Sequence, residues 1–137
     1  SKPLSELNCN YTGLSHLENI NIGEIMITTL HTPGHYGDSV CYWNRIYNNL
    51  FTGDTMFVGR PGRVKSKSSN IYQLFDSIYN IILKLPEKTR LYPGHHYGYA
   101  ESILLKDNII LSNFFQCNNQ IEFNGIMESF EKKLKRR

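Results

Sequence analysis

The chain has 137 residues, of which 40% are hydrophobic, 20% charged and 12% aromatic. This ordinary globular composition, at a length that can bury a core, excludes a disordered, collagen-like or disulfide-scaffold protein. The formal net charge of +3 comes from the C-terminal end, where five of the last six residues are basic and the rest of the chain carries ten basic and twelve acidic side chains. We interpret this end as the solvated last turn of a helix, with a phosphate-binding tail as the alternative. A nucleic-acid partner is not favoured.

The cysteines and the apolar runs indicate the cellular compartment in which the protein is expected to lie. Cys9, Cys41 and Cys117 are widely spaced and form no C-x-x-C pair, which predicts neither a zinc ribbon nor a redox dithiol and favours a reducing, cytoplasmic compartment. No apolar run approaches the roughly 20 residues of a membrane span, and no signal-peptide core is visible, so we expect no membrane partner. The chain also begins without methionine, and we expect either processing or a longer parent polypeptide.

Strands and helices are expected to alternate along the chain. The first twenty residues are polar and irregular, whereas β-branched and apolar residues predict strands over 24–30, 39–43 and 50–52. A loop rich in Gly, Pro, Ser and basic residues follows at 59–70, and a short strand is predicted at 90–92. Helical patterns are predicted near 71–85, 100–111 and 120–135. The alternation indicates an α/β layered domain.

The best-defined helix lies between residue 70 and Pro86. Either Ser69 or Asn70 is expected to cap its N-terminus, and Pro86 ends it. Its apolar residues recur at three- and four-residue spacing and so form one buried stripe. They are Ile71, Leu74, Phe75, Ile78, Ile81, Ile82 and Leu85.

Three polar residues occupy equivalent places, each in a glycine-bearing loop that follows a predicted strand. They are His35 in HTPGH, Asp54 in TGD and His95 in YPGH. Imidazole and carboxylate groups at converging strand ends form a ligand set that suits Zn²⁺ or Fe²⁺. The sequence therefore predicts a metal site made of His35, Asp54 and His95.

The segments HTPGHYGDSVCYW, LFTGDTMFVGRPGR and LYPGHHYG, in this order and spacing, resemble the metallo-β-lactamase superfamily. More narrowly, they resemble its hydroxyacylglutathione hydrolase (glyoxalase II) and persulfide dioxygenase branches. The resemblance spans residues 23–116 and implies a four-layer αββα sandwich. It implies that His35 binds one metal ion, that Asp54 bridges two ions or binds the single iron of the dioxygenases, and that His95 binds the second. The nucleophile would be metal-activated water.

One family motif is absent from this sequence. The family carries an earlier H-x-H-x-D-H motif that supplies further ligands, and this chain contains no H-x-H. We therefore interpret residues 1–137 as a partial domain that corresponds to the C-terminal half of the sandwich. Such a half is expected to expose apolar surface that its missing half normally covers. It is also expected to bind metal weakly and to be inactive alone.

Basic residues beyond Asp54 indicate either an anionic small-molecule substrate or a solvated basic loop. Arg60 and Arg63 flank Pro61-Gly62, and the resemblance implies that the residue at position 63 holds the carboxylate of glutathione. The residues after Arg63 depart from the family pattern, so glutathione itself is not indicated. His31 is interpreted as a packing residue, with support of a ligand as the alternative. His96 is interpreted as a surface residue or a support of a ligand, with direct contact to the metal as the alternative. Tyr97 and Tyr99 are candidates for the rim of the site.

Several functions remain open from the sequence. The first is a glyoxalase-II-like hydrolase that uses one or two Zn²⁺ ions to cleave a thioester or related acyl bond. The second is a persulfide dioxygenase with a single Fe²⁺. The third is a non-catalytic binding module that descends from such an enzyme. A nucleic-acid-processing member of the superfamily ranks last, because only the basic C-terminal end favours it.

Overall fold

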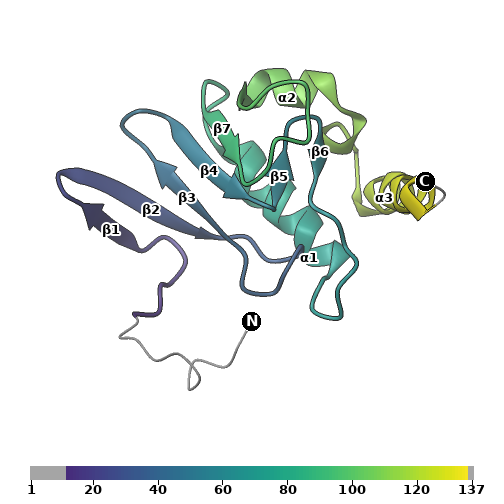
Figure 1. Cartoon of the computed structure of the whole chain (residues 1–137), viewed down its shortest axis with the longest axis horizontal. Coiled ribbons are helices and arrows are strands. Elements are labelled where there is room, and N and C mark those ends of the chain that lie inside the picture. Colours follow the sequence, from purple (N-terminus) through teal and green to yellow (C-terminus); the bar gives the residue numbers. More distant parts are fainter. Residues whose placement is uncertain (1–11, 136–137) are drawn as a thin grey trace.

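The computed structural model of the chain describes residues 12–135. Its centre is a six-stranded sheet in the order β1-β2-β3-β4-β7-β8 (Figure 1). Neighbouring strands are antiparallel except β4 and β7, which are parallel. The strands are β1 (Asn19–Ile22), β2 (Ile25–His31), β3 (Val40–Asn44), β4 (Asn49–Gly53), β7 (Arg90–Pro93) and β8 (Ile103–Leu104). A separate two-stranded hairpin pairs β5 (Met56–Phe57) with β6 (Arg60–Pro61).

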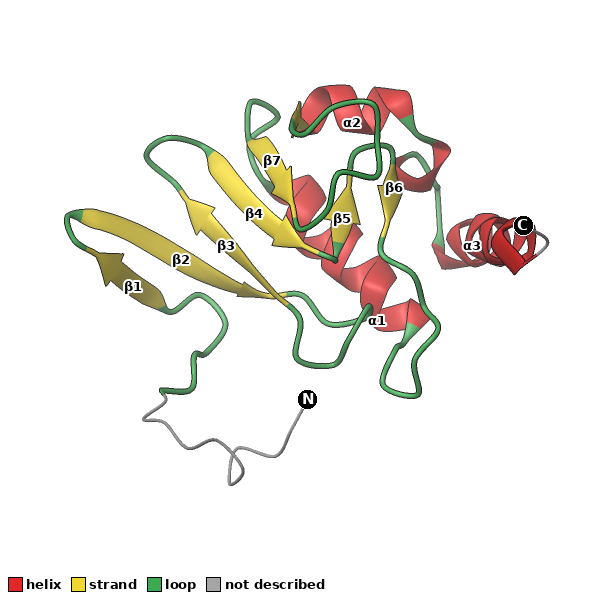
Figure 2. Cartoon of the chain, in the orientation of Figure 1, coloured by secondary structure: helices red, strands yellow, loops and turns green. Residues whose placement is uncertain are grey.

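Helices form the connections that the sheet topology requires. Parallel strands need a crossover, and the chain from β4 to β7 supplies it with a continuous helical segment (Figure 2). The later helices follow β8 and end the described chain. The helical elements are α1 (Ile71–Asp76), a π-helical turn η2 (Ser77–Ile81), a 3₁₀ turn η3 (Ile82–Lys84), α2 (Leu105–Leu111), a 3₁₀ turn η4 (Asn113–Phe115) and α3 (Gln120–Lys135).

The core lies on one side of the sheet, between the strands and the helices. Leu50, Leu91 and Cys41 are almost wholly buried on the strands, and they pack in one cluster with buried side chains of the helices. Burial of each large apolar side chain stabilises the fold by about 1.5–3 kcal/mol. The helical members are Leu74, Ile78, Ile82, Leu105, Phe123 and Met127.

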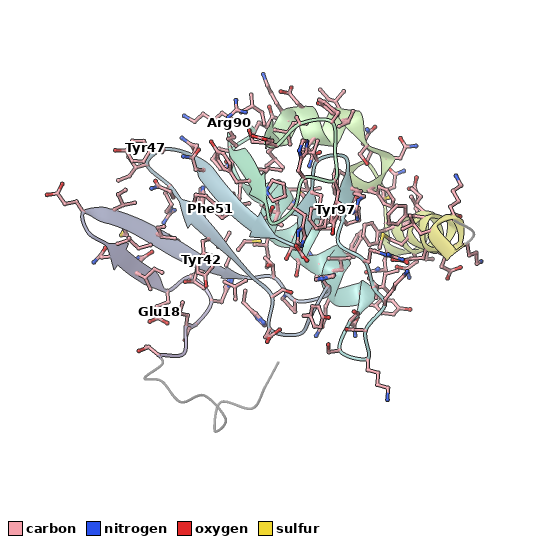
Figure 3. The ribbon with its side chains drawn as sticks, viewed as in Figure 1. Glu18, Tyr42, Tyr47, Phe51, Arg90 and Tyr97 are labelled. Atoms are coloured by element: carbon pink, nitrogen blue, oxygen red, sulfur yellow. The ribbon has the colours of Figure 1, made fainter. Side chains whose placement is uncertain are left out.

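The opposite side of the sheet carries an exposed apolar row. Tyr42, Phe51 and Tyr92 are neighbours in register across β3, β4 and β7. Tyr42 is 37% exposed and Phe51 is 45% exposed, and Figure 3 marks both on adjacent strands. We call this row, from Tyr42 to Tyr92, the open sheet face. Large apolar side chains grouped in this way indicate a surface that another element covers.

The α/β class and most of the expected elements are confirmed. Asn70 is the N-cap of α1, since its side chain accepts hydrogen bonds from the backbone of Tyr72 and Gln73. The segment 71–85 is not one regular helix, because it passes from α through π to 3₁₀ geometry before Pro86. Within residues 12–135, no helix combines the length and apolarity needed to cross a membrane.

Several expected irregular stretches are in fact paired. The expectation that the first twenty residues are irregular was wrong at its end, because β1 begins at Asn19. Gly23 adopts φ 61°, which allows the tight turn that pairs β1 with β2. The helix expected from residue 100 begins only at Leu105, after the two-residue strand β8. Cys9 and the last two basic residues lie outside the described residues.

Candidate metal centre

The loop that carries His35 is fixed to the segment 69–77, which contains α1 and the residues on either side of it. Three consecutive carbonyl oxygens of this loop accept hydrogen bonds from that segment: those of Pro33, Gly34 and His35 accept from Ser77 Oγ, Asn70 N and Ser69 Oγ over 2.6, 2.8 and 2.8 Å. At Gly34 the backbone has φ 136°, and a Cβ would collide with the backbone of Leu74. Only glycine allows this contact, which sets the position of His35 at the end of β2.

Asp54 follows the end of β4, where its side chain lies against a second glycine. The Gly94 amide donates to the carbonyl oxygen of Gly53 over 2.8 Å, which ties the loop after β7 to the end of β4. A Cβ on Gly94 would stand 2.8 Å from Asp54 Oδ1, closer than real Cβ contacts allow. Glycine at this position therefore keeps space for the carboxylate.

The structure brings the three predicted residues together. Because β4 and β7 are parallel, their carboxyl ends meet at one edge of the sheet, and Asp54 and His95 follow them there. Asp54 Oδ1 lies 3.4 Å from Nε2 of His95, and Asp54 Oδ2 lies 3.6 Å from Nε2 of His35. The carboxylate thus presents one oxygen to each imidazole.

A hydrogen bond to the backbone sets the tautomer of His35. Its Nδ1 lies 2.7 Å from the carbonyl oxygen of Arg63, and a carbonyl can only accept, so Nδ1 must carry the hydrogen. In the neutral ring Nε2 then holds a lone pair, and its neighbour is an oxygen of Asp54. Two acceptors at this separation repel each other unless a proton or a metal ion lies between them. A backbone carbonyl that accepts from one ring nitrogen and leaves the other free is the usual way in which metal-binding histidines are oriented.

The donor types and their spacing fit a metal ion, but each position has only two donors. Two ligands each about 2.1 Å from one tetrahedral zinc ion stand about 3.4 Å apart, which matches the separations of Asp54 from His35 and His95. Among residues 12–135, no set of three or more His, Cys, Asp or Glu side chains is placed to hold one ion. The geometry therefore describes two adjacent half-sites that share Asp54.

We call the arrangement of His35, Asp54 and His95 the metal corner. A cavity of about 360 Å³ adjoins it, and the walls of this cavity come from four parts of the chain. Its polar residues are His35, Asp54 and the two arginines of the loop. Aromatic and aliphatic side chains form the remainder, and Figure 3 places Tyr97 beside β5, next to the end of β7. The lining residues are His35, Asp54, Phe57, Arg60, Arg63, Tyr97, Phe130 and Leu134.

The two arginines have different surroundings. Arg60 stacks on aromatic rings, with its guanidinium carbon 4.5 Å from the ring centre of Tyr97 and 4.7 Å from that of Phe57. Burial lowers the pKa of Arg60 from its ordinary value, although the group stays charged at neutral pH. Arg63 instead makes a two-pronged ion pair with Glu131 of α3, in which Nη2 lies 3.0 Å from Oε2.

Among the other histidines and tyrosines of the motifs, Tyr97 lies beside His95, with ring centres 5.1 Å apart, whereas His31 makes other contacts. His31 Nε2 lies 3.1 Å from the carbonyl oxygen of Gly37, and its backbone amide donates to His16 Nδ1. His96 is exposed, and of the two rim candidates Tyr97 lines the cavity while Tyr99 does not. Glu131 was not predicted, because one acid in a charged amphipathic helix carries no local signal of its partner.

The site thus consists of two imidazoles on opposite oxygens of one carboxylate, placed at the strand ends of an α/β fold. The family model described as "Metallo-beta-lactamase superfamily" matches residues 11–95. The chain belongs to the metallo-β-lactamase superfamily, and the resemblance found in its motifs is confirmed.

Individual relatives agree with this assignment. The chain is 35% identical over 121 residues to a hydroxyacylglutathione hydrolase of Dictyostelium discoideum, covering 79% of this chain and 44% of that protein. It is 32% identical over 114 residues to a Bacillus subtilis protein named probable polyketide biosynthesis zinc-dependent hydrolase PksB, covering 83% of this chain and 50% of that one. The crystal structure of ETHE1 from Myxococcus xanthus is similar with a TM-score of 0.81 at 28% identity, covering 93% of this chain and 56% of that one. The chain thus spans about half the length of the curated relatives that it matches.

Proposed function

We propose that this chain supplies His35, Asp54 and His95 to the centre of a metal-dependent hydrolase that cleaves a thioester or a related acyl bond. The observation that carries the proposal is the position of Asp54, which faces His35 with one oxygen and His95 with the other. The similarity to a hydroxyacylglutathione hydrolase and to a zinc-dependent hydrolase supports this type of reaction.

Each residue has a proposed role in this centre. Asp54 would bridge two ions, with His35 on one side and His95 on the other, and the carbonyl oxygen of Arg63 holds His35 in the tautomer that leaves Nε2 free. Bound Zn²⁺ would supply a Lewis acid that polarises the acyl carbonyl and lowers the pKa of water. The adjoining cavity would hold the acyl substrate beside Arg60.

The number of donors suggests that further ligands come from outside the described residues. A structural or catalytic zinc site uses three or four protein ligands, whereas each half-site here has two. The open sheet face supports the same conclusion, because Tyr42 and Phe51 leave apolar surface for a second layer to cover. We propose that this chain alone is inactive and that activity requires that layer.

We also propose that the protein works in a reducing, cytoplasmic compartment, in which the buried thiols of Cys41 and Cys117 would stay free.

A chimera tests the proposal. The matched segment of the Dictyostelium discoideum hydroxyacylglutathione hydrolase is replaced by this chain, and the product is assayed for zinc content and for hydrolysis of S-D-lactoylglutathione and of acetyl thioesters. We expect one to two zinc ions and measurable hydrolysis of at least one thioester. Asp54→Asn should lower both strongly, since it removes the shared oxygen charge, and Asp107→Asn, an exposed acid on α2, should change neither.

Other outcomes decide between the alternatives. A folded chimera without transition metal would contradict the hydrolase and favour a binding module. Iron in place of zinc, together with oxygen consumption on a persulfide, would favour the dioxygenase. Tight stoichiometric zinc binding by this chain alone would contradict the idea that further ligands are needed.

A further inference from the structure

We propose that Arg60, and not Arg63, binds the anionic group of the substrate, and that Glu131 determines this specificity by occupying the guanidinium of Arg63. The inference rests on the proposed function, because it concerns the cavity beside the same metal corner. The ligand class is an acyl compound with an apolar chain and one compact anion, either a carboxylate or a phosphate.

Arg63 is already paired with a carboxylate of this chain through Nε and Nη2. Its Nε lies 3.3 Å from both oxygens of Glu131, and its Nη2 lies 3.0 Å from Oε2. Lys65 Nζ adds a second positive charge at 3.6 Å from the same oxygen. The side chain of Glu131 is only 16% exposed, so this pair is largely shielded from water and salt. A substrate carboxylate would have to displace Glu131 and leave this mostly buried acid with only Lys65 as its partner, which is costly.

The anchoring of α3 keeps Glu131 in this position. Met127 and Phe123, one and two turns earlier in the helix, are at most 1% exposed and belong to the core. Phe130 and Leu134, on either side of Glu131, line the cavity. The helix therefore cannot withdraw Glu131 without exposing part of the core, and the ion pair is a fixed part of the wall.

Arg60 is held in the opposite way, by aromatic faces. Its guanidinium carbon lies 4.5, 4.7 and 5.6 Å from the ring centres of Tyr97, Phe57 and Phe130. Its Nη1 donates to the carbonyl oxygen of Pro61 over 3.3 Å, so most of its five N–H groups remain unused. No carboxylate among residues 12–135 forms a salt bridge with Arg60. The aromatic rings orient the planar guanidinium group of Arg60 without neutralising its charge.

The apolar part of the cavity wall determines which kind of chain can be attached to the anionic group. Phe57, Phe130 and Leu134 present apolar surface in the same cavity, which favours a hydrocarbon chain over a polar one. An anion at Arg60 and an apolar chain along these side chains would bring the acyl group towards Asp54, which lines the cavity with them.

Binding of hexanoate to the metal-free chain tests the inference. The protein is passed over a chelating resin, and hexanoate or neutral hexanol is titrated while the Nε–H signals of Arg60 and Arg63 are followed by NMR. We expect hexanoate to shift the Arg60 signal and to bind more tightly than hexanol. Arg60→Gln should weaken hexanoate at least about tenfold and change hexanol binding much less, because it removes the charge that only the carboxylate uses. Arg63→Gln should change hexanoate binding less than about twofold.

Substitution of Glu131 supplies the second arm of the test. Glu131→Gln should free Arg63 and raise hexanoate affinity several-fold, and the gain should vanish when Arg63→Gln is added. Glu128→Gln is the matched control: it removes one acid from the same helix, but that acid is exposed and pairs with Lys132, so binding should not change. Equal effects of Arg60→Gln and Arg63→Gln, no shift of the Arg60 signal, or no gain from Glu131→Gln would overturn the inference. Because no metal is present, these results are independent of whether the chimera binds zinc.

Discussion

The Nδ1–H group of His35 donates its hydrogen bond to the backbone carbonyl oxygen of Arg63, across 28 positions of the sequence and over 2.7 Å. The side chain of that same arginine is bound by Glu131 of α3. The orientation of the imidazole and the wall of the cavity are therefore fixed through one residue. The backbone and the side chain of Arg63 are thus both held in place, which keeps Nε2 of His35 beside Asp54.

The first prediction concerns the tautomer of His35. Because the Arg63 carbonyl oxygen can only accept a hydrogen bond, the neutral ring should be predominantly the Nδ1–H form. Long-range ¹H–¹⁵N NMR spectra of the ring nitrogens report this directly, with the exposed His96 as an internal reference that lacks this constraint. A predominant Nε2–H form of His35 would contradict the proposed orientation.

The second prediction uses two glycines that differ in their surroundings. Gly94→Ala places a Cβ 2.8 Å from Asp54 Oδ1 and 3.2 Å from the backbone of Gly53, so the carboxylate and the strand end must move apart. In the chimera we expect zinc affinity to fall at least tenfold and the free energy of unfolding to fall by about 1–3 kcal/mol. Zinc titration and thermal denaturation measure the two effects.

Gly125→Ala is the control for this change. Gly125 lies in α3, and a Cβ there meets nothing within 4 Å. Alanine should therefore stabilise the protein by about 0.5–1 kcal/mol, because it favours the helix, and it should leave zinc binding unchanged. If Gly94→Ala behaved in the same way, the glycine would not be needed to make space for Asp54.

The convergence of His35, Asp54 and His95 could be predicted because it depends on local rules. Each residue stands in a glycine-bearing loop after a strand, and parallel neighbours such as β4 and β7 end at the same edge of a sheet. The N-cap at Asn70 could be predicted for a similar reason, since its side chain bonds to amides only two and three residues away.

The role of Glu131 could not be predicted, because it depends on packing between distant segments. Glu131 and Arg63 are 68 positions apart, and nothing in the amphipathic pattern of α3 distinguishes this acid from the exposed Glu128. Arg63 was expected to bind substrate on the strength of its motif, whereas the structure gives its guanidinium to Glu131. Side-chain pairing across the fold decides such roles, and periodicity does not report it.

The third prediction concerns Asn108, which supports the hairpin that carries Phe57 and Arg60. This side chain on α2 is fully buried. Its Oδ1 accepts from the Gly59 amide over 2.7 Å, and its Nδ2 donates to the carbonyl oxygen of Phe57 over 3.1 Å. Asn108→Ala leaves both backbone groups without a partner and should cost about 3 kcal/mol of unfolding free energy.

The same substitution should also affect the cavity. Because the hairpin loses its support, hexanoate binding at Arg60 should weaken along with stability. Urea denaturation and the NMR titration measure the two effects. Asn80→Ala, at an exposed side chain that contacts only Asp76, should stay within about 0.5 kcal/mol of the parent. An equal cost at both positions would contradict a supporting role for Asn108.

The fourth prediction concerns alkaline pH and the thiol of Cys41 in β3. Burial raises the pKa of this thiol from 9.0 to about 11, against a smaller opposing effect of its hydrogen bond with Thr32. The unfolded thiol ionises near its ordinary pKa while the folded thiol stays protonated, so the unfolded state binds fewer protons above pH 9. The stabilising effect of the neutral buried thiol is complete below pH 9. It should be lost progressively between pH 9 and 11, by about 2–3 kcal/mol in total at one pKa unit per 1.36 kcal/mol.

Urea denaturation at pH 8, 9, 10 and 11 measures how the free energy of unfolding falls with pH. Cys41→Ala should remove the part of this slope that belongs to Cys41, although Cys117 contributes in the same direction. Identical slopes for the parent and Cys41→Ala would show that Cys41 ionises as readily in the folded chain as in the unfolded one.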